Sequence, residues 1–165
     1  MKTEIVDHLQ VEKIIKRLAY QIYERNFDVK ELIIASIEGQ GKEVALLISD
    51  ELKKISKINV KNISIRINKV NPETESILLS DPDIKLNDKT IVLVDDVLNT
   101  GRTLLFGIMP FLNQKLKSIQ VAVLVERSHN SFPISADFVG ISLQTTLQEH
   151  VSVIMKNHKI NIYLE

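Results

Sequence analysis

The sequence predicts an α/β domain with a mainly parallel sheet flanked by helices, because continuous apolar runs alternate with helical patterns along the chain. Three of these runs, at 32–35, 90–94 and 119–125, consist mainly of Val, Ile and Leu, as in strands covered on both faces. The 165 residues, 44% of them hydrophobic, supply material for one sizeable core. We therefore expect a single domain over residues 1–165.

The first half of the chain predicts two helices and two strands. Residues 10–25 place their apolar side chains on one helical face, and Asn26 can end this helix. The apolar run at 32–35 is a strand, and a Gly-containing turn leads from it into a second helix at 42–55. Residues 60–67 alternate polar and apolar side chains, which predicts another strand.

The second half begins with a long polar connection. About twenty residues, from 68 to 89, carry no periodic pattern, and a loop of that length in one domain is usually functional or mobile. The strand at 90–94 follows, then a loop at 97–103 and a helix at 103–116 with a kink at Pro110. The remaining strands are predicted at 119–125, 137–141, 151–155 and 160–164.

Composition excludes several classes of protein. The 21 basic and 21 acidic side chains balance, so net charge gives no argument for nucleic acid as an obligatory partner, although a local basic patch would be compatible with it. The absence of cysteine excludes disulfides and thiolate chemistry. The first ten residues lack an apolar signal core, and no stretch approaches the roughly 18 apolar residues of a membrane span. We expect a soluble cytoplasmic protein without a membrane partner.

Two adjacent carboxylates, Asp95 and Asp96, stand at the end of the predicted strand 90–94. They can accept hydrogen bonds from vicinal ribose hydroxyls, or hold Mg²⁺ through its water ligands. Residues 99–103 open the next helix, where backbone N–H groups and hydroxyls favour a phosphate dianion, and Gly101 allows a close approach of the backbone. Ligands of open α/β sheets bind beyond the carboxyl ends of the strands. The motif therefore predicts a sugar-phosphate site.

Two other interpretations of this motif are simpler. The acid pair can merely solvate a strand end, and Thr-Gly-x-Thr can merely form a capped turn. A phosphorylation-receiver domain also uses acids at strand ends. It would place its acid pair after the first strand and a separate phosphoacceptor after the third, without a Thr-Gly phosphate loop. The combination of a buried strand, two acids and Thr-Gly-Arg-Thr in one register favours the sugar-phosphate site.

The segment 91–103, IVLVDDVLNTGRT, is similar to the 5-phosphoribosyl-1-pyrophosphate (PRPP) signature of type I phosphoribosyltransferases. The order of elements over nearly the whole chain also fits that family. Two further segments, 119–129 and 132–140, resemble the PyrR branch, whose members are bifunctional uracil phosphoribosyltransferases that also regulate pyrimidine operons. The resemblance implies the type I phosphoribosyltransferase fold with a small hood.

The resemblance also implies roles for individual residues. Asp95 and Asp96 would bind the ribose hydroxyls of PRPP. The 5′-phosphate would be held by Asn99, Thr100, Gly101, Arg102 and Thr103. The hood segment Glu149, His150 and Val151 would offer main-chain contacts to the base. Mg²⁺ would be carried by PRPP rather than bound by the protein alone, and family members commonly form homodimers or homotetramers.

Two residues favour a pyrimidine over a purine. Asn99 takes the fifth place of the acidic signature, where the 6-oxopurine enzymes carry an aspartate that serves the purine N7. An amide cannot accept a proton in that way. Glu126 stands where those enzymes carry a lysine that reads the purine oxygen. The implied reaction is the transfer of the phosphoribosyl group from PRPP to a nucleobase, with uracil expected, and the release of pyrophosphate.

Other positions depart from the family pattern. Gly39 and Gln40 fall in the expected pyrophosphate loop, but PyrR-like enzymes tend to carry an arginine in place of Gln40, and Glu38 adds a negative charge there. In the flexible loop, Arg66 or Lys69 can supply a cation over the pyrophosphate, and Arg66 joins Asp95 and Asp96 as a catalytic candidate. The departures leave open an alternative, a PRPP- or nucleotide-binding regulatory protein with weakened turnover.

RNA receives only weak support as a partner. The basic face that PyrR proteins use for RNA is retained here at four positions, Lys16, Arg17, Arg127 and His129. Uncharged residues replace cations at three others, Tyr20, Asn130 and Ser135. Because phosphate contacts set the affinity of such a surface, each lost cation weakens it.

Overall fold

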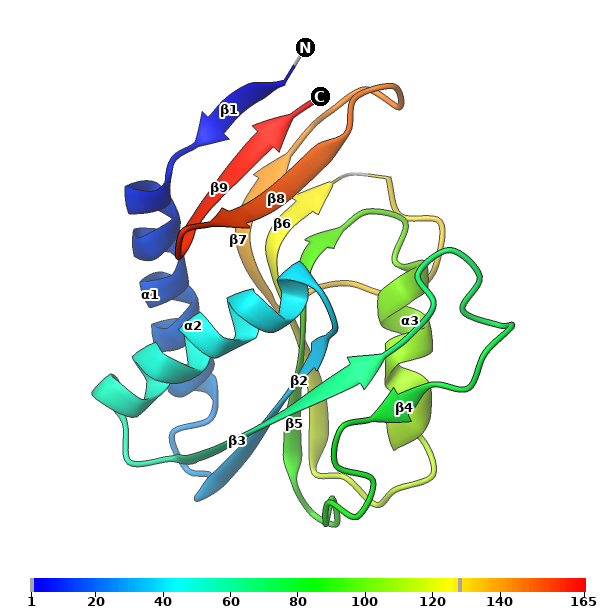
Figure 1. Cartoon of the computed structure of the whole chain (residues 1–165). Helices are drawn as coiled ribbons and strands as arrows, with labels where there is room; N and C mark the ends of the chain where they lie inside the picture. Colours follow the sequence, from blue (N-terminus) through cyan, green and yellow to red (C-terminus); the bar gives the residue numbers. More distant parts are fainter. Residues whose placement is uncertain (1, 128) are drawn as a thin grey trace.

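A six-stranded sheet forms the centre of the protein, as the computed structural model shows for residues 2–127 and 129–165 (Figure 1). Its strand order is β4-β3-β2-β5-β6-β7, with antiparallel pairing only between β3 and β4 among the described residues. The strands are β2 (Glu31–Ile37), β3 (Asn59–Arg66), β4 (Leu78–Leu79), β5 (Thr90–Leu98), β6 (Ser118–Arg127) and β7 (Phe138–Leu143). The predicted α/β fold with a mainly parallel sheet is confirmed.

The central strands are apolar along their length because both faces of the sheet are covered. Helices α1 (His8–Arg25) and α2 (Gln40–Ile55) lie on one face, and α3 (Arg102–Ile108) lies on the other (Figure 1). Neighbouring residues of β2 consequently enter different clusters, Ile34 with the two long helices and Ile33 with Leu104 of α3. This double burial explains the continuous apolar runs in the sequence.

Helix α1 has well-defined ends. The Asp7 side chain accepts a hydrogen bond from the Gln10 backbone N–H at 2.9 Å, and the Gln10 side chain accepts one from the Asp7 N–H at 3.0 Å. This capping box moves the helix start two residues ahead of the predicted residue 10. Asn26 ends the helix as predicted, with its buried side-chain amide bonded to the Ile22 carbonyl and to Gln120.

A second, three-stranded antiparallel sheet has the order β1-β9-β8 and is the predicted hood. Its strands are β1 (Thr3–Val6), β8 (Val151–Lys156) and β9 (Lys159–Leu164). Figure 1 shows it near the carboxyl ends of the main strands, where β8 contacts α2 and β5. The sequence did not predict β1, because four residues are too few for a pattern and their partner strand lies at the other end of the chain.

The predicted ends of the strand at 90–94 and of the helix that follows it were wrong. Strand β5 continues through Asp95 to Leu98, because β6 is long enough to pair Leu98 with Glu126, and the loop begins only at Asn99. The helix predicted at 103–116 ends at Ile108 and is followed by a 3₁₀ turn, η1 (Met109–Phe111). Pro110, which lacks an N–H donor, ends the helix rather than kinking it.

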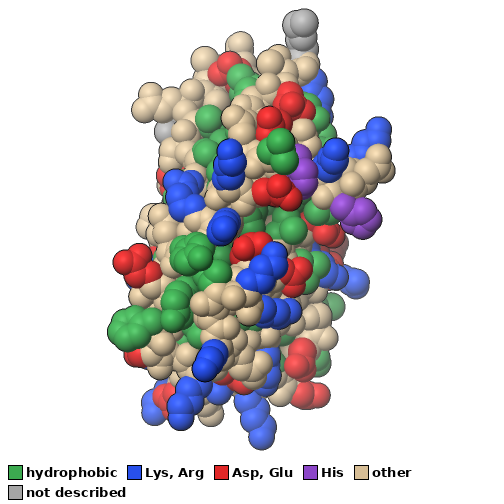
Figure 2. Space-filling model, turned by 90° about the vertical axis from the view of Figure 1, so that its left-hand side faces the viewer, with side chains coloured by type: hydrophobic (Ala, Val, Ile, Leu, Met, Phe, Trp, Pro, Cys, Tyr) green, Lys and Arg blue, Asp and Glu red, His purple; other side chains and the backbone are tan. Residues whose placement is uncertain are grey.

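Charged side chains of both signs are interspersed on the face seen from the left of Figure 1 (Figure 2). Helix α2 carries ion pairs three residues apart, Lys53 with Asp50 and Lys54 with Glu51. Within the described part of the chain, no helix has both the length and the apolar character needed to cross a membrane.

Candidate active site

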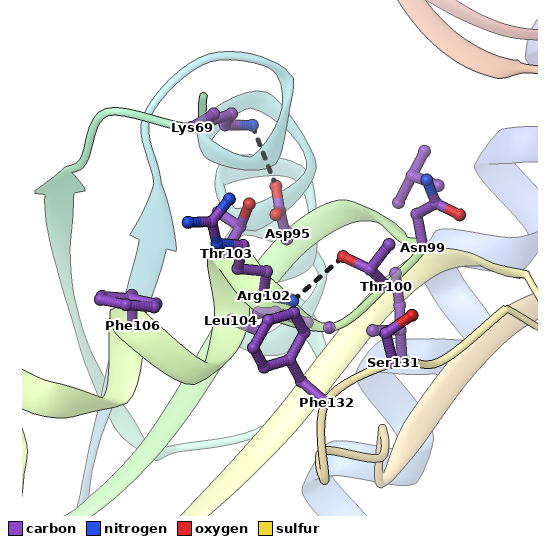
Figure 3. Close-up of a pocket in the computed structure, with 13 residues that line it drawn as sticks. Lys69, Asp95, Asn99, Thr100, Arg102, Thr103, Leu104, Phe106, Ser131 and Phe132 are labelled. Carbon is purple, nitrogen blue, oxygen red and sulfur yellow. Dashed lines mark hydrogen bonds and ion pairs between the residues drawn. The ribbon is translucent and has the colours of Figure 1, made fainter. Parts of the chain in front are cut away.

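A pocket of about 620 Å³ opens at the carboxyl end of β5 (Figure 3). The end of the strand, the loop that follows it and the first turns of α3 form one side of this pocket. Lys69, from the long connection after β3, and the pair Ser131 and Phe132 complete it. Of the predicted site, Asp95 and all five residues from Asn99 to Thr103 line this pocket.

The loop from Asn99 to Arg102 has a fixed shape. Gly101 has φ of +86°, which favours glycine, and a Cβ there would overlap the Ile134 side chain. The Thr100 carbonyl accepts hydrogen bonds from the Ser131 and Phe132 N–H groups at 2.9 and 3.0 Å. The Arg102 N–H donates to the Thr100 hydroxyl at 3.3 Å. Because α3 has only seven residues, an anion here would depend on the amides and hydroxyls of the loop more than on a helix dipole.

The acid pair combines a buried and a partly buried carboxylate. Asp95 is 3% exposed, and its Oδ1 accepts a hydrogen bond from the Asp96 N–H at 2.9 Å. Burial, and then the negative charge of Asp96, raise the pKa of Asp95 well above its ordinary range. The Lys69 Nζ opposes this shift from 3.5 Å, and it lies 3.9 Å from Asp96 Oδ1. The site therefore holds concentrated negative charge beside a single ammonium group.

The expected pyrophosphate loop also lies close to that ammonium group. Gly39 has φ of +102°, and a Cβ built on it would be 3.9 Å from Lys69 Nζ. Gln40 begins α2, and its buried Oε1 has no hydrogen-bond partner among the described residues. Neither residue lines the pocket itself. Arg66, at the end of β3, also lies outside the lining and is paired with Glu38 at 3.4 Å.

The hood segment predicted to contact the base is not in the pocket lining either. The His150 N–H and carbonyl are both bonded to Glu165 at 2.8 Å, so the predicted main-chain contacts of His150 would require these bonds to open. Val151 is buried, and Glu149 bonds through its carboxylate to the Thr146 N–H and hydroxyl, which lowers the pKa of Glu149.

Two cations of the expected RNA-binding face are engaged within the protein. Arg127 is 4% exposed and donates to the Thr145 hydroxyl at 2.9 Å and to the Glu149 carbonyl at 2.7 Å. Arg17 donates to the Gly140 carbonyl. Sequence reasoning missed the role of Arg127 in holding the connection between β7 and β8, because that connection carries no periodic signal. It also missed Ser131 and Phe132 as pocket residues, although segment 132–140 carried part of the resemblance.

Comparisons with known proteins agree with this geometry. Residues 1–156 match the phosphoribosyl transferase domain family. The bifunctional protein PyrR of Clostridioides difficile is 36% identical over 162 residues, covering 92% of this chain and 90% of the relative. That of Clostridium acetobutylicum is 32% identical, covering 99% and 98%.

Solved structures show the same fold. The hypoxanthine phosphoribosyltransferase of Trypanosoma cruzi aligns with a TM-score of 0.79 at 16% identity, over 97% of this chain and 95% of that one. A hypoxanthine-guanine phosphoribosyltransferase from Bacillus anthracis aligns with a TM-score of 0.69 at 20% identity, over 86% and 82%. The chain therefore belongs to the type I phosphoribosyltransferase family, and bifunctional PyrR proteins are among its sequence relatives.

Proposed function

We propose that this protein transfers the phosphoribosyl group of PRPP to uracil and releases pyrophosphate. The observation that carries the proposal is the placing of Asp95, Asn99 and Thr100 around one pocket, with Asp96 beside them in β5. The two carboxylates suit the ribose hydroxyls, and the fixed loop at Thr100 and Gly101 suits the 5′-phosphate.

In this reaction a bond forms between the ribose C1 of PRPP and the uracil N1, and the bond from C1 to the pyrophosphate oxygen breaks. The uracil N1 proton passes to the released pyrophosphate or to water as the new bond forms. The sugar becomes cation-like on the way, so the protein mainly has to hold the ribose in place and stabilise the departing negative charge. Buried Asp95 and the rigid loop at Gly101 supply the fixed geometry that this needs.

The donor atoms of the site fit Mg²⁺ arriving with PRPP. Mg²⁺ takes oxygen ligands and keeps several of its waters, and the Asp95 and Asp96 carboxylates are the groups that would bond those waters. The ion would neutralise charge on the leaving pyrophosphate.

Asn99 supports uracil over a 6-oxopurine as the base. It lines the pocket, and its neutral amide cannot take a proton from the base. By resemblance, Glu126 takes the place of the lysine that reads the purine oxygen. It lies outside the pocket lining at the end of β6, where its carboxylate accepts a hydrogen bond from the Ser142 hydroxyl at 3.3 Å.

A steady-state assay with PRPP, Mg²⁺ and a panel of bases tests the proposal. We expect uridine monophosphate from uracil and no nucleotide from hypoxanthine or guanine. Nucleotide from a purine alone would contradict the uracil assignment, and no nucleotide from any base would contradict the enzymatic one.

One arrangement favours a second candidate, a nucleotide-binding regulator with weakened turnover. Arg66 is paired with Glu38 rather than facing the pocket, and Gln40 brings no charge to the pyrophosphate loop. Calorimetric binding of PRPP without turnover on any base would support this candidate over the first.

Assembly and RNA binding are separate proposals. Membership in the family supports a homodimer or homotetramer, which sedimentation equilibrium would test. Of the four retained positions, Arg17, Arg127 and His129 form hydrogen bonds within the protein, and among the described residues exposed Lys16 is the one without such a bond. We therefore expect at most weak, salt-sensitive RNA binding.

A further inference from the structure

The connection between β3 and β5 is attached to the pocket at two points. Lys69 points its ammonium group at Asp95 from 3.5 Å (Figure 3), and the same group lies 3.9 Å from Asp96. Four residues further on, Glu73 accepts a hydrogen bond at 2.7 Å from Arg102, the first residue of α3. Arg102 also reaches the Val70 carbonyl at 3.5 Å. Arg102 and Glu73 thus hold the connection in the position that brings Lys69 to the acids.

The contact at Asp95 involves the atoms that a ligand would need. Asp95 Oδ1 already accepts the Asp96 N–H, and the same oxygen faces Lys69. Ribose hydroxyls, or the waters of Mg²⁺, would bond to these carboxylates as well. Lys69 therefore has to give up part of its contact with the acids when PRPP enters.

The nearest alternative place for the ammonium group lies close by. A Cβ on Gly39 would be only 3.9 Å from Lys69 Nζ, so the ammonium group lies close to the expected pyrophosphate loop as well as to the acid pair. That loop carries the neutral Gln40 at a position where a cation would stabilise the negative charge of a pyrophosphate, and Glu38 in the same loop is negative. A small movement of Lys69 would supply the missing positive charge.

We propose that Lys69 neutralises the acid pair in the ligand-free protein and transfers to the pyrophosphate of PRPP when the ligand binds, with the Arg102–Glu73 pair positioning the connection. The inference rests on the proposed function of the pocket. Lys69 is then a substrate-binding residue with two partners in turn, and Glu73 is a positioning residue that acts through Arg102.

The two roles predict effects of opposite sign for two ligands that differ only in the pyrophosphate. Ribose 5-phosphate must displace Lys69 from the acids and offers no pyrophosphate in return. PRPP displaces it and then binds it. Removing the ammonium group should therefore strengthen binding of ribose 5-phosphate and weaken binding of PRPP.

Calorimetric titration of Lys69→Met with ribose 5-phosphate, and with PRPP plus Mg²⁺, tests this directly. We expect the Kd for ribose 5-phosphate to fall about two- to fivefold, as for loss of a half-exposed ion pair. The Kd for PRPP should rise roughly tenfold, as for loss of a charge-assisted hydrogen bond. Lys69→Arg should restore most of the PRPP affinity, and Glu73→Gln should move the ratio of the two Kd values in the same direction as Lys69→Met.

Lys85→Met is the matched control, because Lys85 is exposed in the same connection and lies outside the pocket lining. It removes the same charge and should leave the ratio of the Kd values unchanged. If Lys69→Met weakens both ligands equally, or changes neither, the inference is wrong while the proposed function stands. If the wild-type protein binds neither ligand, both are wrong.

Discussion

Gly41 gives Asp95 the room that it occupies: a Cβ on Gly41 would lie 2.8 Å from Asp95 Oδ1 and 3.1 Å from Asp95 Cα. The first turn of α2 thus packs directly against the carboxyl end of β5. Because two close neighbours of that Cβ belong to one residue, one of them a backbone atom, Asp95 cannot yield by rotating its side chain alone. This contact fixes the buried acid relative to the expected pyrophosphate loop.

Gly41→Ala should consequently damage both stability and binding. Overpacking of this kind costs about 1–3 kcal/mol, and the better helix propensity of alanine offsets about 1 kcal/mol. We expect denaturant unfolding to show a net loss of about 1 kcal/mol, and calorimetry to show weaker PRPP binding. Gly107→Ala is the control, since its close neighbour is the flexible end of Ile37. Unchanged PRPP affinity in Gly41→Ala would contradict the packing argument.

Asp95→Asn should stabilise the fold at neutral pH while weakening PRPP binding. The raised pKa of Asp95 means that the folded protein holds this proton more tightly than the unfolded chain does. Ionisation therefore costs stability as the pH rises through the raised pKa. Below the ordinary aspartate pKa of about 3.9, the carboxyl is neutral in both states and costs nothing.

Thermal unfolding across pH checks this sign. At pH 8 we expect the Tm of Asp95→Asn to exceed that of the wild type by a few degrees, at about 2–4 °C for each kcal/mol in a domain of this size. The difference should shrink as the pH falls toward about 4. A lower Tm for the variant at pH 8 would show that the Lys69 ion pair outweighs the burial cost.

Arg127→Met should affect the base more than PRPP. The buried guanidinium holds Thr145, Thr146 and Glu149 in the connection next to the hood. Steady-state kinetics should show the KM for uracil rising several-fold, which corresponds to the free energy of roughly one charge-assisted hydrogen bond. The KM for PRPP should change little. The exposed Arg25→Met, which loses its pair with Asp137 and its stacking on the Phe138 ring far from the hood connection, should leave both KM values unchanged. Equal rises in both KM values for Arg127→Met would argue for a general loss of structure.

The elements that have a local pattern of apolar residues were predictable from the sequence. The run from Thr90 to Val94 is apolar because it is buried on both faces. Of the two acids that follow it, Asp95 lines the pocket and Asp96 lies beside it in β5. Strand β1 was not predictable, because Thr3 pairs with Leu164 at the far end of the chain.

Contacts made by irregular segments could not be predicted from the sequence either. Lys69 was one of two candidate cations, and only the folded connection shows that it, rather than Arg66, faces the acids. The Glu73 contact that helps hold it there depends on Arg102, which sequence reasoning had assigned to phosphate alone. Such contacts follow no period of 2 or 3.6 residues, so pattern analysis cannot find them.

The central claim is that the acid pair and the loop after β5 together bind a ribose phosphate. Its most direct test is a calorimetric titration of PRPP with Mg²⁺ into the wild type, Asp96→Asn and the double variant Thr100→Ala with Thr103→Ala, with the exposed Asp28→Asn as control. We predict that the wild type and Asp28→Asn bind alike, and that each site variant binds roughly tenfold more weakly or worse. Site variants that bind PRPP as tightly as the wild type would contradict the claim.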